Sequence, residues 1–172
     1  LELNEFSLYH AERTFRNLSS IPIVPCLGSV QDSELLKHLL HDHQINTVYH
    51  AAAYKHVPLV EENPLQGLHN NALGTLSLLE KCLEADVNSF VLISTDKAVR
   101  PTNVMGASKR IAEMIVKDRG RRFPEHKMGI VRFGNVLDSS GSVVPLFREQ
   151  IKKLMPITVT HPEITRYFMS IG

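Results

Sequence analysis

Four short apolar runs constrain the fold of this 172-residue chain more than any other feature. They cover residues 21–27, 45–53, 90–94 and 128–136, and each is nearly continuous and rich in valine and isoleucine. Strands buried on both faces have this pattern, which is typical of a parallel sheet covered by helices. Segments with helical spacing lie between and beside the runs, at 5–17, 33–43, 64–85, 103–123 and 143–153. The alternation predicts a doubly wound parallel α/β sheet, with a loop at 138–142 and a small strand at 157–159.

The composition is that of an ordinary globular protein. Hydrophobic residues make up 43% of the chain and charged residues 22%, and 19 basic against 18 acidic residues leave a formal charge of +1. This balance gives no sign of a nucleic-acid partner. No apolar run is long enough for a membrane span, no signal peptide is visible, and two cysteines form no disulfide framework. We therefore expect a reducing compartment.

Both ends of the sequence are abrupt. The chain opens on Leu1 without an initiating methionine and closes at Gly172, where an apolar segment is starting. We expect it to be a piece of a longer protein.

Polar and small residues gather where the predicted strands end. In a doubly wound sheet, ligands bind at the carboxyl ends of the strands. These ends are 51–53, 94–97 and 134–136. The second contains Thr95, Asp96 and Lys97, which could be a plain turn or a catalytic group. Met105 and Lys109 follow at helical i, i+4 spacing, which alone indicates only a packed methionine beside a lysine.

Five motifs taken together resemble a known family. They are HAAAYKHVP at 50–58, NALGT at 71–75, STDKAV at 94–99, RFGNV at 132–136 and TRYFM at 165–169. In this order and spacing they resemble the extended short-chain dehydrogenases/reductases, in particular the polysaccharide-biosynthesis UDP-N-acetylglucosamine 4,6-dehydratases. The resemblance covers essentially the whole chain. It implies a Rossmann-like fold that lacks its first strand, its glycine-rich turn and part of its sugar-binding lobe. It also places the central part of the NAD(P)-binding domain at 1–136 and the start of the nucleotide-sugar-binding region at 137–172.

The resemblance implies NAD as the cofactor, with NADP as the alternative. Glu2 matches the acidic residue at the end of the family's second strand, where a carboxylate binds a ribose diol and repels a 2′-phosphate. Lys109 matches the lysine that binds the nicotinamide ribose. The other residues that match cofactor-binding positions are Ser29, Val30, Ala51, Ala52, Ala53 and Asn71. Without the glycine-rich turn, we expect this chain alone neither to hold NAD tightly nor to turn over.

The catalytic residues implied by the resemblance are Thr95, Asp96, Lys97, Met105 and Lys109. In the family, Asp96 matches the acid that protonates the departing C6 hydroxyl, and Lys97 matches the base that removes the C5 proton. Met105 stands where the family usually has tyrosine. Because a thioether is a poor proton acceptor, Thr95, Lys109 or a water must take the O4 proton. Methionine here is typical of the large, membrane-anchored branch, which is associated with retention at C5.

The substrate residues implied by the resemblance are Lys55, His56, Asn135 and Arg166, with Arg166 suited to a diphosphate. Asp138 and Met155 stand where relatives have glycine. His38, His41 and His43 are interpreted as a solvated helix end, so no metal is predicted.

The sequence therefore predicts a nucleotide-sugar 4,6-dehydratase, a lyase of bacterial surface-polysaccharide biosynthesis. One alternative is a nucleotide-sugar 4-epimerase, which needs no acid at C6. Another is a non-catalytic nucleotide-binding domain, which only Met105 favours. The family resemblance further implies a homo-oligomer on the cytoplasmic side, with the full-length protein anchored in the inner membrane outside this segment.

Overall fold

The computed structural model describes residues 1–137, 143–159, 161, 163, 165 and 167–170. The chain divides into two compact units, Leu1–Val131 and Arg132–Gly172. Each unit is described by itself.

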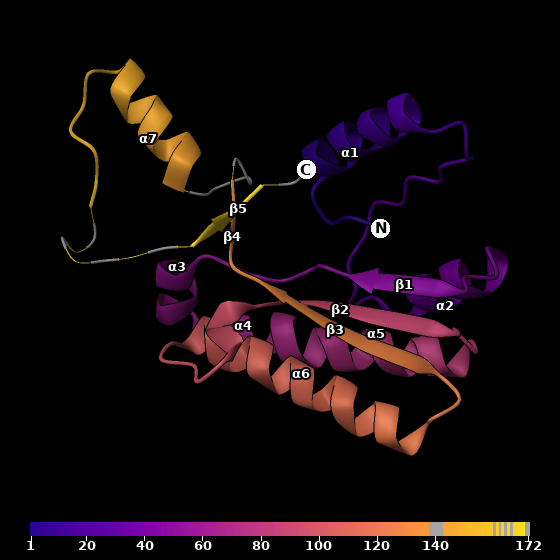
Figure 1. Ribbon diagram of the computed structural model, residues 1–172. Helices are drawn as coiled ribbons and strands as arrows, with labels where there is room; N and C mark the ends of the chain where they lie inside the picture. The colour runs from indigo at the N-terminus through magenta and orange to yellow at the C-terminus, as the bar shows by residue number, and fades with distance from the viewer. Residues whose placement is uncertain (138–142, 160, 162, 164, 166, 171–172) are drawn as a thin grey trace. The chain divides into compact units, whose positions relative to one another are not determined.

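A three-stranded sheet, to which the first unit contributes nearly all residues, has the order β1-β2-β3 (Figure 1). The strands are β1 (Thr47–His50), β2 (Ser89–Thr95) and β3 (Lys127–Phe133). β1 and β2 pair in parallel, with Thr47 opposite Ser89 and His50 opposite Leu92. The predicted parallel α/β arrangement is confirmed. The carboxyl ends of β1 and β2 therefore lie at the same edge of the sheet.

Helices α5 (Gly74–Glu84) and α6 (Val104–Arg122) cover one face of this sheet (Figure 1). Helix α2 (Ser33–Asp42) packs against α5. The side chains of Asp32 and Asn103 cap α2 and α6 by accepting backbone N–H groups, as N-cap residues do. The core between these elements consists of buried apolar side chains: Leu36, Leu40, Leu78, Leu79, Cys82, Val87, Phe90, Leu92, Ala112 and Val116.

The segment predicted as one helix over 64–85 consists of three successive helices. It comprises α4 (Pro64–Leu68), a π-helix η1 (His69–Leu73) and α5, and the unpredicted helix α3 (Val57–Glu62) precedes it. Single π-helical turns are rare and are found frequently at functional sites. Here the π-helix contains Asn71, a residue of the predicted cofactor site.

The predicted strand at 21–27 is wrong. Its only described pairing is a single parallel bridge between Leu27 and Glu2. Pro22 and Pro25 cannot donate to a ladder, which explains why the apolar run does not form a longer strand. Helix α1 (Glu5–Leu18), capped by Asn4, lies between these two segments in sequence.

The second unit contains a short parallel pair, β4 (Asn135–Val136) with β5 (Phe168–Met169), and helix α7 (Val143–Lys152). The predicted run 128–136 is thus divided at Gly134 between β3 and β4. The strand predicted at 157–159 is also wrong. Instead, Thr158 is tied to α7, because its backbone N–H and its hydroxyl hydrogen-bond the side chain of Gln150 at 3.2 and 2.7 Å.

Candidate active site

The turn that follows β2 holds three of the predicted catalytic residues. Thr95 ends the strand and caps the 3₁₀ turn η2 (Asp96–Ala98). The Thr95 hydroxyl donates to Asp96 Oδ1 at 2.9 Å, and Lys97 Nζ donates to the same oxygen at 3.0 Å. The side chains of Asp96 and Lys97 are 52% and 30% exposed. The three residues therefore form one hydrogen-bonded group that solvent can reach.

The charge state of Asp96 follows from this geometry. Partial burial raises the pKa of the carboxyl, but hydrogen bonds from Lys97 and Thr95 and the Lys97 charge outweigh it, and the net shift is downward. In the described state Asp96 is thus an ionised carboxylate paired with an ammonium. In this state Asp96 lacks the proton that a general acid must carry.

The start of helix α6 packs closely on this turn. A Cβ atom at Gly106 would collide with the backbone carbonyl of Lys97, so only glycine allows the approach. Asn103 Oδ1 accepts the Gly106 N–H at 2.8 Å and fixes the first turn of the helix. Met105, beside Gly106, is buried, 4% exposed. The usual tyrosine position thus carries an apolar side chain in the core.

Lys109 lies one turn further along α6 and is also buried. Its Nζ donates to the backbone carbonyl of Ile93, on β2, at 2.7 Å. Burial lowers the pKa of Lys109 to about 8, although the Glu113 carboxylate opposes the shift. Lys109 can therefore change charge near neutral pH, unlike an ordinary lysine.

Asn71 joins the loop after β1 to helix α6. Its Nδ2 donates to the backbone carbonyl of Tyr54 and to Ser108 Oγ, both at 3.0 Å. Its Oδ1 accepts the Tyr54 N–H at 2.7 Å and Asn70 Nδ2 at 3.1 Å. Asn71 is completely buried. It holds this loop through the loop's backbone, and its predicted role in cofactor binding stays a prediction.

His50, which sequence reasoning missed, ends β1 in a buried position. Its Nε2 lies 2.9 Å from the Thr75 hydroxyl, which itself donates to the Asn71 carbonyl at 2.7 Å. Because that hydroxyl proton is already used, His50 Nε2 is the donor and Nδ1 carries no proton. Burial and the nearby Lys109 charge lower the pKa of His50 to about 4. The available signal was a histidine near the end of a predicted strand, directly before three alanines.

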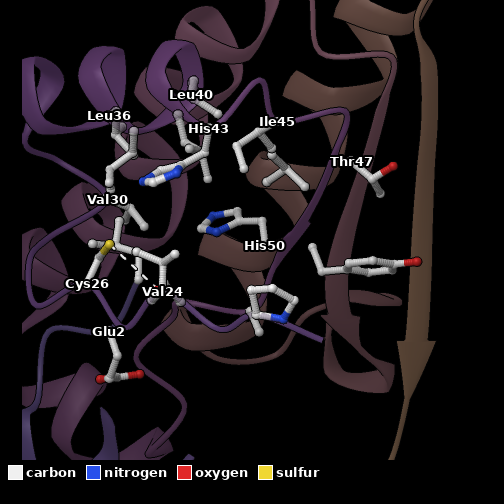
Figure 2. Close-up of a pocket in the computed structure, with 18 residues that line it drawn as sticks. Glu2, Val24, Cys26, Val30, Leu36, Leu40, His43, Ile45, Thr47 and His50 are labelled. Carbon is white, nitrogen blue, oxygen red and sulfur yellow. Dashed lines mark hydrogen bonds between the residues drawn. The ribbon is translucent and has the colours of Figure 1, made fainter. Parts of the chain in front are cut away.

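A cavity of about 670 Å³ opens beside β1 (Figure 2). Of the predicted cofactor residues, Glu2, Val30, Ala51 and Ala52 line it. Most of the remaining lining is apolar, including Leu36, Leu40 and Ile45. The Glu2 carboxylate accepts the Asn4 N–H at 2.9 Å, and the Ser29 hydroxyl accepts the Gln31 N–H at 3.1 Å. The carboxylate residue Glu2 and the small residues Ala51 and Ala52 thus line one cavity together with apolar side chains.

The predicted substrate residues are divided between the two units. Lys55 and His56 are exposed after β1, with His56 at the start of α3. Asn135 lies in the second unit, where its Nδ2 donates to the Tyr167 carbonyl at 3.2 Å. Arg166 and Asp138 lie outside the described residues. No cluster of three metal-ligating side chains occurs in the described part of the chain.

A Rossmann-like parallel sheet and the lysine-bearing helix packed on the end of its second strand place the chain among the extended short-chain dehydrogenases/reductases. The family described as polysaccharide biosynthesis protein matches residues 1–172. The chain belongs to that family.

Three relatives show what the chain is similar to. It is 48% identical over 169 residues to the capsular polysaccharide biosynthesis protein CapD of Staphylococcus aureus, covering 97% of this chain and 28% of that protein. It is 51% identical over 145 residues to the probable polysaccharide biosynthesis protein EpsC of Bacillus subtilis, covering 84% and 24%. It is 40% identical to a UDP-glucose 4-epimerase of Rickettsia rickettsii, covering 84% and 42%. The chain thus spans from about a quarter to less than half of these relatives.

Two solved structures share the fold. Pen from Bacillus thuringiensis superposes with a TM-score of 0.88 at 31% identity, covering 98% of this chain and 52% of that one. DesIV from Streptomyces venezuelae, a dTDP-glucose 4,6-dehydratase solved with NAD, gives a TM-score of 0.80 at 20% identity, covering 92% and 54%. At that identity DesIV shows the fold alone. None of the described helices is both long and apolar enough to cross a membrane.

Proposed function

We propose that the complete protein is an NAD(P)-dependent 4,6-dehydratase that converts UDP-N-acetylglucosamine to a UDP-4-keto-6-deoxy-N-acetylhexosamine. The observation that carries the proposal is the Asp96–Lys97 pair at the end of β2, joined at 3.0 Å. An acid and a base are what elimination of water across C5 and C6 requires. In this proposal residues 1–136 are the central part of the NAD(P)-binding domain, and residues 137–172 begin the nucleotide-sugar-binding region.

A bound NAD(P) would supply the hydride chemistry of the reaction, namely uptake of a hydride from C4 of the sugar and its return to C6. Lys97 removes the C5 proton that the C4 ketone has acidified, and Asp96 protonates the C6 hydroxyl as it leaves as water. Lys97 then returns a proton to C5. The proton released from the O4 hydroxyl restores the one that Asp96 gave up, so the net change is loss of one water.

The resting pair already contains the proton that this chemistry needs. An ionised Asp96 with a protonated Lys97 holds the same number of protons as a neutral acid with a neutral amine. Excluding water disfavours the charged forms of both groups. We infer that substrate, by covering these partly exposed side chains, moves one proton from Lys97 to Asp96 and so creates the acid and the base together.

The O4 proton needs an acceptor other than Met105, which is a buried thioether. Lys109, with its pKa lowered to about 8, is partly neutral just above neutral pH. We assign it this proton, received through the Thr95 hydroxyl or a water.

The mass of the product tests the proposed reaction. The complete protein is incubated with NAD and UDP-N-acetylglucosamine, and the nucleotide sugar is analysed by mass spectrometry. Loss of one water is expected. An unchanged mass with inversion at C4 would identify a 4-epimerase, the alternative that the similarity to the Rickettsia enzyme favours. No conversion of any UDP-amino sugar would favour a non-catalytic nucleotide-binding domain.

A further inference from the structure

One face of helix α6 contacts three neighbouring positions of the strand and turn that carry the catalytic residues. Gly106 packs on the Lys97 carbonyl, Lys109 donates to the Ile93 carbonyl, and Glu113 accepts from Ser94. Positions 106, 109 and 113 share a helix face. Gly106 allows the close packing on the catalytic turn and Lys109 is the proposed proton acceptor, whereas Glu113 takes no part in the proposed reaction.

Glu113 is a fully buried carboxylate, 0% exposed. Its Oε1 accepts the hydroxyl of buried Ser94 at 2.7 Å, and its Oε2 accepts Arg110 Nη1 at 3.0 Å. Arg110 is 41% exposed, so its charge is partly screened by solvent. A buried carboxylate is costly unless charges and hydrogen bonds compensate it. An apolar residue at this place would pack without that cost, so the carboxylate has a role other than filling space.

We propose that Glu113 is a positioning residue of the active site, which fixes Ser94 directly before Thr95 and balances the ammonium of Lys109 from within the core. The proposal deepens the proposed function, since Glu113 offsets part of the effect of burial and so helps to set the pH at which Lys109 becomes neutral and can accept a proton. Glu113 and Lys109 stand at i, i+4 spacing on α6 and bind adjacent residues of β2.

The charged groups around Lys109 determine the direction in which its titration should move when one of them is removed. Glu113 on α6 favours the ammonium, burial disfavours it, and the pKa of His50 on β1 is in turn lowered by the Lys109 charge. The turn η2 packed on α6 adds the Asp96–Lys97 pair, whose opposite charges lie 3.0 Å apart and largely cancel. Arg110 offsets the Glu113 charge. Removing Glu113's charge should therefore move the titration of Lys109 to lower pH, and removing Arg110's charge should move it to higher pH.

The experiment measures Lys109 directly. The complete protein, without cofactor or substrate, is labelled with ¹³C at lysine Cε, and the Lys109 signal, assigned with Lys109→Met, is followed against pH. Glu113→Gln is expected to shift the titration down, and Arg110→Gln to shift it up. Glu80→Gln is the control, because Glu80 pairs with Arg119 outside the site, and it should leave the titration in place.

The two variants test the coupling to Lys109 separately. If Glu113→Gln does not fold, Arg110→Gln still gives a test, because an exposed arginine can be changed with little effect on the core. An unchanged Lys109 titration in Arg110→Gln, or in a folded Glu113→Gln, would overturn the proposal. These readouts need no turnover, so they are independent of the dehydratase assignment. If that assignment also holds, the acidic limb of the kcat profile moves in the same directions.

Discussion

Two neighbouring groups of polar residues in the first unit differ in how they are held. One group is buried in the core: His50, Asn71, Thr75, Ser94, Ser108, Lys109 and Glu113. The other is the turn Thr95–Lys97, where Asp96 and Lys97 keep substantial exposure. In the buried group hydrogen bonds are fixed by helices η1, α5 and α6. In the turn the main interaction is an ion pair between adjacent residues.

The difference separates most of the positioning residues from the acid and the base of the proposed elimination, with buried Lys109, the proposed acceptor of the O4 proton, as the exception. Leaving a buried polar group unsatisfied costs about 1–3 kcal/mol, whereas a solvent-exposed ion pair contributes about 0–1 kcal/mol. The buried group therefore contributes to folding and sets the site's shape in advance. The turn contributes little to stability, and in the proposed mechanism it changes its protonation when substrate covers it. Substitutions in the buried group should therefore mainly lower stability, whereas substitutions in the turn should mainly lower turnover.

The largest effect is expected on turnover from Asp96→Asn and Lys97→Ala. Loss of the acid or the base should reduce kcat by about 10²–10⁴-fold. The free energy of unfolding should change by less than about 1 kcal/mol, because the pair is partly exposed. Steady-state kinetics and urea denaturation measure the two quantities. Asp42→Asn, an exposed carboxylate of α2, is the control; near-normal turnover in either site variant would contradict the assigned roles.

The next effect is expected from Asn71→Ala, and it is mainly a loss of stability. This change removes four hydrogen bonds and leaves the buried Ser108 hydroxyl and the Tyr54 backbone with fewer partners. Unfolding free energy should fall by about 3–4 kcal/mol. Asn63→Ala, which removes a single exposed hydrogen bond to Leu59, should cost under about 1 kcal/mol in the same urea titration. Equal costs for the two variants would show that Asn71 is not a structural tie.

The buried group should also give the protein an acid-sensitive stability. His50 has a pKa of about 4 when folded and 6.5 when exposed, so the unfolded chain binds more protons between these values. Stability should therefore fall as pH drops from about 6.5 to about 4, by about 3 kcal/mol. His50→Gln should flatten this part of the stability profile, while His41→Gln, on an exposed side chain, should not. A profile of unchanged slope in His50→Gln would exclude His50 as its source.

A smaller effect is expected where helix α6, which carries part of the buried group, packs on the turn at Gly106. Gly106→Ala should push α6 away from the Lys97 carbonyl and cost about 1–3 kcal/mol, together with a loss of kcat. Gly120→Ala, in the same helix, places its Cβ at 3.4 Å from Met128 Cβ, which is ordinary contact. Because alanine favours helix, the latter should be neutral or stabilise by up to about 1 kcal/mol. If both alanine variants behave alike, the close packing at Gly106 has no special role.

Sequence patterns predicted the elements that are long and periodic. The parallel strands β1 and β2 and the helices at 33–42 and 104–122 follow directly from them, and so does the position of Thr95–Lys97 at a strand end. The π-turn around Asn71 could not be predicted, because the same leucine periodicity runs through α4 and α5. The apolar run at 21–27 has the composition of a strand, but Pro22 and Pro25 lack the N–H groups that a ladder needs. The roles of His50 and Glu113 depend on contacts with residues 25 and 19 positions away, which no local pattern encodes.

The hydrogen at C5 of the product tests the central claim most directly, namely that Asp96 and Lys97 carry out an elimination. The complete protein is allowed to act on UDP-N-acetylglucosamine in D₂O, and the product is analysed by NMR. Deuterium at C5 of a 4-keto-6-deoxy sugar is predicted, because the partly exposed Lys97 amine carries solvent deuterons before substrate covers it and can return one of them to C5. A product that keeps its original C5 hydrogen and its C6 hydroxyl would contradict the account.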